Sequence, residues 1–232
     1  MSTNNQSYLR YAHVQMAAEA FLIDPDTGNV FENGERFRLA LQTGNEFNSK
    51  FSVSHAVEFD KNWEVVAHQP NTASGFSATL FRGIGDENAG ELVIAFRSTE
   101  FIGDAMRHNQ ATNKMEVEAH GWAFGQIADM EGWYASLKAT GAIPESTHFA
   151  VSVYSLGRHL ATAFNLLHQA EGRIAATYTF NGAGVGDVDT GTSLAAVIER
   201  FERMRKNTSG AQIVFSHAAH RSESGIAGRL AT

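Results

Sequence analysis

Hydrophobic residues recur along this chain in two patterns, and each pattern predicts one kind of element. Short, nearly continuous apolar runs rich in β-branched and aromatic residues are typical of buried strands, whereas apolar residues spaced three and four apart are typical of helices that pack by one face. The first pattern predicts strands over 63–67, 75–81, 91–97, 149–154, 174–181 and 211–217. The second predicts helices over 8–23, 37–47, 120–138 and 192–206, and one that begins just after Ser155.

Between residues 91 and 181 the predicted strands and helices alternate. This βαβ succession favours parallel strands joined by right-handed crossovers. A chain of 232 residues is long enough for one such domain with a sizeable core. We therefore expect a single α/β domain over residues 1–232, with a mostly parallel central sheet and helices on both faces.

The composition argues against several classes of binding partner and of catalytic chemistry. A formal net charge of -7 and the lack of a Lys/Arg-rich block argue against nucleic acid or an anionic membrane surface as the main partner. The chain has no cysteine, which excludes disulfides, a thiolate nucleophile and cysteine-ligated metal. Neither a signal peptide nor a bilayer-spanning stretch is predicted, which leaves both the cytoplasm and export without a leader peptide open.

Ser155 lies where the strand 149–154 meets the following helix. A serine on a sharp strand-to-helix turn is the geometry of a nucleophile elbow, in which Oγ stands clear of the sheet and the next backbone N–H, that of Leu156, points into an oxyanion pocket. The usual pattern is Gly-x-Ser-x-Gly: Gly157 fits it, and Val153 stands in place of the first glycine. A serine that only caps the helix is the alternative.

Thr99 follows the most apolar of the predicted strands, 91–97. Enzymes of the α/β class gather their chemistry at the C-terminal edge of the central strands, so the N–H and hydroxyl of Thr99 are candidates to stabilise an oxyanion. A hydroxyl that is bonded locally within a turn is the alternative interpretation.

Two short motifs raise the question of a cofactor, and neither has the full spacing. The segment 24–28 with Glu35 partly follows a calcium loop, but its glycine comes one place early, and a plain β-turn is the alternative. The glycines within 182–186 follow a predicted strand, but Asp187 replaces the third glycine of a dinucleotide fingerprint. We therefore expect neither a metal nor a cofactor.

Three stretches together resemble the class 3 lipases of the α/β-hydrolase fold, and in particular the lipase-type domains of large bacterial proteins. Residues 92–100 are similar to the family's Ala-Phe-Arg-Gly-Thr strand end, residues 155–161 to its Gly-His-Ser-Leu-Gly-Gly elbow, and residues 177–182 to the strand that enters its Phe-Gly-x-Pro loop. The segments 69–81 and 180–184 add to the likeness, which extends over about residues 11–201.

The resemblance implies an α/β-hydrolase-like fold and a serine ester hydrolase of the lipase or carboxylesterase type, acting on lipid or short acyl esters through an acyl-enzyme. In this family the residue that matches Ser155 is the nucleophile, and those that match Thr99 and Leu156 form the oxyanion hole. The chain departs from the family where it has Ser98 for Gly, Val153-Tyr154 for Gly-His and Arg158 for Gly.

A serine nucleophile needs a histidine base that is oriented by a carboxylate. Asp187 is the candidate acid and His217 the candidate base, with His220 as the alternative base. The family's acid and base come later along the chain than these residues do. The alternative function is therefore a catalytically impaired or silent hydrolase-fold domain, either with a binding role or as a C-terminally shortened form.

Overall fold

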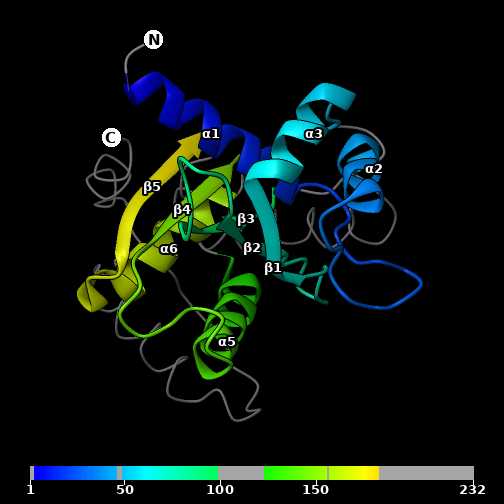
Figure 1. Ribbon diagram of the computed structural model, residues 1–232. Coiled ribbons are helices and arrows are strands. Elements are labelled where there is room, and N and C mark those ends of the chain that lie inside the picture. Colours follow the sequence, from blue (N-terminus) through cyan, green and yellow to red (C-terminus); the bar gives the residue numbers. More distant parts are fainter. Residues whose placement is uncertain (1–2, 46–48, 99–122, 156, 183–232) are drawn as a thin grey trace.

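The computed structural model describes residues 3–45, 49–98, 123–155 and 157–182 (Figure 1). The helices are α1 (Thr3–Ala18), α2 (Glu35–Thr43), α3 (Val53–Asn62), α5 (Phe124–Ala139) and α6 (Gly157–His168), with the short 3-10 helix η2 (Gln169–Glu171). The strands are β1 (Trp63–Gln69), β2 (Ala78–Gly83), β3 (Leu92–Phe96), β4 (Phe149–Tyr154) and β5 (Ile174–Phe180). None of the described helices is long and apolar enough to cross a membrane.

The strands form one sheet in the order β1-β2-β3-β4-β5. β1 pairs with β2 and β2 with β3 in antiparallel fashion, while β3 pairs with β4 and β4 with β5 in parallel. The α/β class is therefore confirmed, but within the described residues the sheet is mixed rather than mostly parallel. The reason is that short turns connect β1 to β2 and β2 to β3, whereas a parallel pairing needs a long crossover, and only the connections through α5 and α6 are crossovers.

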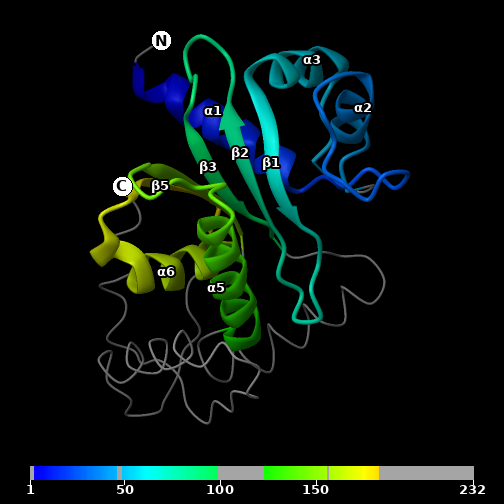
Figure 2. The same ribbon diagram turned by 60° about the horizontal axis from the view of Figure 1, so that its bottom comes forward.

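The sheet separates two hydrophobic clusters, and β3 contributes alternate residues to each. Leu92, Ile94 and Phe96 join a cluster with α5 and α6, while Val93 and Ala95 join a cluster with α1, α2 and α3. Figure 2 shows α1 on one side of the sheet and α5 and α6 on the other. The expected helices on both faces are thus confirmed. All residues of β3 are buried, as expected of a strand covered on both faces.

The chain from β4 to β5 follows its sequence pattern closely. The predicted strand 149–154 is β4 with the same bounds, and the apolar run from 174 becomes β5. Helix α3 was not predicted, because only Ala56 and Phe59 supply buried apolar side chains over its ten residues. Ser52 fixes its start, since Oγ accepts the N–H of His55 at 3.2 Å. The predicted helix 192–206 and strand 211–217 lie outside the described residues.

Candidate functional site

Ser155 occupies the turn between β4 and α6, and its backbone is left-handed, with φ of 49°. A positive φ is uncommon for a residue other than glycine and marks a turn that the surrounding structure imposes. The N–H of Ser155 donates to the carbonyl of Phe180 on β5 at 3.1 Å, and its carbonyl accepts the N–H of Arg158 at 3.1 Å. The strand, sharp turn and helix of a nucleophile elbow are therefore present, with a serine in the turn.

Gly157, at the start of α6, lies against the end of β3. A Cβ added to it would lie 2.8 Å from the carbonyl oxygen of Phe96 and 3.3 Å from Cβ of Val153. The first distance is shorter than van der Waals packing allows, so this position requires glycine. Val153 is fully buried in the cluster with α5 and α6. A valine fits in the first glycine position of the elbow pattern because Gly157 has no side chain to meet it.

Replacing Gly157 with alanine is expected to lower the free energy of unfolding by about 1–3 kcal/mol, because the new methyl group overpacks the contact with Phe96. Urea unfolding measures this change. Gly132→Ala in α5 is the matched control, since a Cβ at Gly132 would meet nothing within 4 Å and alanine favours a helix interior by up to about 1 kcal/mol over glycine. Equal stability of the two variants would contradict the close approach at Gly157.

A buried carboxylate holds the chain just beyond the end of β3. Glu19 is 4% exposed. Its Oε1 accepts the backbone N–H of Ser98 and its Oε2 accepts the hydroxyl of Ser98, both at 2.9 Å. Nε2 of Gln15 also donates to Glu19 at 2.9 Å, and Nε of Arg97 lies 3.9 Å from Oε2. Burial raises the pKa of Glu19, and the hydrogen bonds from Ser98 and the charge of Arg97 act against that shift.

A small pocket opens beside this carboxylate, between α1 and the ends of β4 and β5. Its volume is about 240 Å³, and it is lined by Ala12, Gln15, Met16, Glu19, Ser49, Tyr154 and Phe180. Tyr154 directly precedes Ser155, and Phe180 accepts the N–H of Ser155, so the pocket lies next to the turn. Pockets for drug-sized ligands start at about 300 Å³, which means that this one suits a small organic group.

Arg158 lies across the end of β5 on the other side of the turn. Its Nη1 donates to the carbonyl of Gly182 at 3.4 Å. A Cβ added to Gly182 would lie 2.2 Å from Cδ of Arg158, so the arginine stem covers this glycine directly. The side chain that replaces a glycine of the lipase pattern thus packs over the start of the loop after β5 and places a cation at this edge of the sheet.

His159 lies close to the turn, and no sequence signal singled it out. Its side chain is fully buried in the first turn of α6, and Nε2 accepts the N–H of Ala123 at 2.9 Å. Burial lowers the pKa of His159 to about 3. The imidazole is therefore neutral at ordinary pH, and it joins the start of α6 to the residue that precedes α5.

Stability is expected to fall in acid because of His159. The unfolded chain takes up a proton at this residue near pH 6.5, whereas the folded chain does so only near pH 3, so stability is lost as the pH falls below 6.5. The contribution of His159 amounts to about 2 kcal/mol between pH 7 and pH 5. Urea unfolding at both values should show a smaller loss in His159→Gln than in the wild type. His148→Gln, at an exposed histidine, is the control, and an acid loss in His159→Gln as large as that of the wild type would contradict this account.

The described part of the chain contains one of the predicted site residues, Ser155. The others lie outside it: Thr99, Leu156, Asp187, His217 and His220. The acid, the base and the oxyanion donors therefore stay predictions. What the structure adds at the same edge of the sheet is the bond between Glu19 and Ser98, the pocket beside it, and the neutral His159.

The segment 24–28 forms a turn that is closed by its own polar groups. Oδ1 of Asp24 accepts the N–H of Asp26 at 2.9 Å, and the carbonyl of Asp24 accepts the N–H of Gly28 at 2.8 Å. The guanidinium of Arg36 lies 2.7 Å from the Asp24 carboxylate and 2.6 Å from that of Asp26. Because an arginine neutralises both carboxylates, the β-turn interpretation is favoured over a calcium loop.

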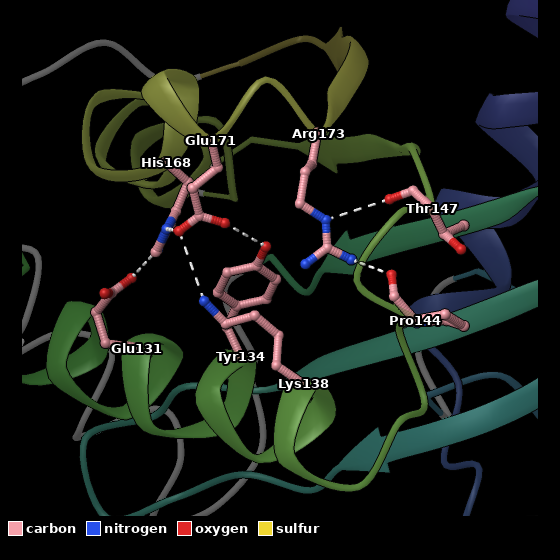
Figure 3. Close-up of polar contacts among 8 residues, drawn as sticks. All are labelled: Glu131, Tyr134, Lys138, Pro144, Thr147, His168, Glu171 and Arg173. Atoms are coloured by element: carbon pink, nitrogen blue, oxygen red, sulfur yellow. Dashed lines mark hydrogen bonds and ion pairs between the residues drawn. The ribbon is translucent and has the colours of Figure 1, made fainter.

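A second polar cluster lies at the opposite end of α6 and joins α5, α6 and η2 (Figure 3). Nε2 of His168 lies 2.6 Å from Oε1 of Glu131, and its Nδ1 lies 2.7 Å from Oε1 of Glu171. The hydroxyl of Tyr134 donates to Oε2 of Glu171 at 3.0 Å. Helix α6 separates this cluster from the turn at Ser155, since its 12 residues span roughly 18 Å at 1.5 Å per residue. The cluster joins α5 to the end of α6, and it is not part of the candidate site.

Within the described ranges no group of three or more His, Cys, Asp or Glu side chains is placed to hold a metal ion. The candidate site therefore consists of a serine turn, a buried carboxylate and a small pocket. Comparison with protein-family models, with curated proteins and with solved structures finds no match for this chain.

Proposed function

We propose that the protein is an ester hydrolase of the α/β-hydrolase type with Ser155 as its nucleophile. The observation that carries the proposal is the turn at Ser155, where φ is 49° between a buried parallel strand and a helix. A turn of this kind displays the serine Oγ at the C-terminal edge of the sheet, next to the positive end of the α6 dipole. Gly157 supports the proposal, because the close approach of the Phe96 carbonyl is the steric reason for the second glycine of the elbow.

The proposal includes an α/β-hydrolase-like arrangement of the strands and helices around Ser155. Strands β3, β4 and β5 are adjacent and parallel, and α5 and α6 connect them as crossovers. The order strand, helix, nucleophile strand, helix, strand is the one that the resemblance to class 3 lipases implies for the catalytic half of the sheet. The hairpins from β1 to β3 extend the sheet on the other side.

The proposed reaction is acyl transfer to Ser155 followed by hydrolysis. Oγ bonds to the acyl carbon of the ester and gives its proton to a histidine base, while the N–H groups of Thr99 and Leu156 stabilise the oxyanion. The ester C–O bond then breaks, and the alcohol leaves with that proton. A water molecule attacks the acyl-enzyme, which releases the carboxylic acid and restores the serine.

The base and the acid in this scheme come from the sequence pattern. We propose His217 as the base, with His220 as the alternative, and Asp187 as the carboxylate that orients it. His159 is not a candidate, because its Nε2 already accepts a hydrogen bond from Ala123 and its side chain is fully buried.

Reaction with a fluorophosphonate tests the proposal. In this reaction the serine Oγ bonds to phosphorus and fluoride leaves, which requires an activated serine. Intact-mass analysis should show one adduct, peptide mapping should place it on Ser155, and denaturation before labelling should abolish it. Ser152, buried on the same strand, serves as the internal control and should stay unlabelled. A folded protein without an adduct, or with an adduct elsewhere, would overturn the proposal.

A catalytically silent domain with a binding role is the second candidate. Arg158 favours it, because the lipase pattern has a glycine at position 158. Here the arginine side chain covers Gly182 at the edge of the sheet. Tyr154, 41% exposed, stands in place of the pattern's histidine. If the folded wild type gives no adduct, the double variant Arg158→Gly/Tyr154→His is labelled in the same way. It distinguishes a complete site that these two side chains silence from a site that lacks other catalytic groups. Labelling gained by this variant would show that these two residues silence an otherwise complete site.

A further inference from the structure

We propose that Glu19 is a positioning residue for the acyl transfer at Ser155: by accepting both the N–H and the hydroxyl of Ser98, it fixes the end of β3 beside the nucleophile. The inference rests on the proposed function and adds Glu19 to it, the residue that directly follows α1. Glu19 itself touches neither the acyl group nor the reacting atoms in this scheme.

Ser98 and Ser155 follow the same paired position of the sheet by equal numbers of residues. Phe96 on β3 is paired in parallel with Val153 on β4. Ser98 and Ser155 each lie two residues beyond this pair, at the C-terminal edge of neighbouring strands. Thr99, the proposed oxyanion donor, is the next residue after Ser98. The position of Ser98 therefore sets where the chain leaves β3 toward Thr99.

The sheet does not hold Ser98 by itself. The paired part of β3 ends at Phe96, and the N–H of Arg97 donates to the carbonyl of Ser77 at 3.0 Å. One residue further, the bonding partner changes from backbone to side chain, because the N–H and the hydroxyl of Ser98 both donate to Glu19 at 2.9 Å. The carboxylate thus continues the hydrogen bonding of the strand past its last paired residue.

The two bonds use both oxygens of Glu19, one for each donor. Hydrogen bonds to a carboxylate are among the stronger ones in proteins, and they gain strength where water is excluded. Gln15 orients the carboxylate from α1, since its Nε2 donates both to Glu19 and to the carbonyl of Phe96 at 3.1 Å. A glutamine at position 19 replaces one of the two acceptor oxygens with an NH₂ group, which only donates, so the two donors of Ser98 can no longer each have an oxygen of their own.

Glu19→Gln tests the proposal, with Asp60→Asn as the matched control. Asp60 is also buried, accepts a backbone N–H from Gly34 at 2.8 Å and faces Arg38 at 3.1 Å, but it lies at the end of α3. Fluorophosphonate inactivation yields a maximal rate and a half-saturating concentration for each variant. We expect the maximal rate to fall at least about tenfold in Glu19→Gln with the half-saturating concentration little changed, since a misplacement of about 1 Å can cost 10²-fold in rate.

In Asp60→Asn the labelling rate should match the wild type even where both variants lose thermal stability. Wild-type labelling in Glu19→Gln, or an equal loss in Asp60→Asn, would overturn the positioning role. Should Glu19→Gln fail to fold, Ser98→Ala decides: it removes one of the two donors, and an unchanged labelling rate would overturn the inference. A wild type that is not labelled would instead refute the proposed function, so the two failures are distinguishable.

Discussion

Replacing Glu131 with alanine is expected to lower the free energy of unfolding by about 1–3 kcal/mol, because it leaves one nitrogen of a buried histidine without its hydrogen-bond partner. His168 is 1% exposed and Glu131 4% exposed, and their nearest atoms are 2.6 Å apart. The lost partner is the more deeply buried of the two, since the side chain of Glu171 is 28% exposed and lies beside Lys138. Urea unfolding at pH 7 measures the change.

Two further variants separate the loss of the pair from the loss of packing. Glu171→Gln should cost less than Glu131→Ala, because water reaches its carboxylate. Replacing Glu131 and His168 together with leucine should recover much of the loss, since replacing both partners of a buried hydrogen bond with apolar side chains can be nearly neutral. A loss below about 1 kcal/mol in Glu131→Ala, or a double leucine variant no more stable than Glu131→Ala, would contradict this role.

The features that could be predicted from the sequence are those that local patterns determine. The run from 149 to 154 alternates between apolar and small side chains because both faces of β4 are covered, and the pattern ends where Ser155 begins the turn. The elbow pattern predicted that position 157 requires a glycine, and the close approach of the Phe96 carbonyl gives the physical reason. The turn therefore carries its own signal within five residues.

The features that could not be predicted depend on residues far apart along the chain. Glu19 and Ser98 are 79 positions apart, and Glu131 and His168 are 37 positions apart, so no periodicity links either pair. The mixed sheet was missed for a related reason. The antiparallel half of the sheet, β1 to β3, follows from short connections between predicted strands. The expectation of a mostly parallel sheet came instead from the βαβ order between residues 91 and 181.

Replacing Ser155 with alanine is expected to reduce the turnover of an activated acyl ester at least about 10³-fold, because without Oγ no acyl-enzyme forms and water must attack the ester directly. Stability should change little, since serine and alanine meet the same strain at φ of 49°. Ser152→Ala is the matched control from the same strand: its Oγ is buried and donates to the carbonyl of Tyr11 at 2.9 Å. That variant should lose about 1 kcal/mol of stability and keep its turnover. Unchanged turnover in Ser155→Ala would move the chemistry away from this serine, and the turn would then be only the start of a helix.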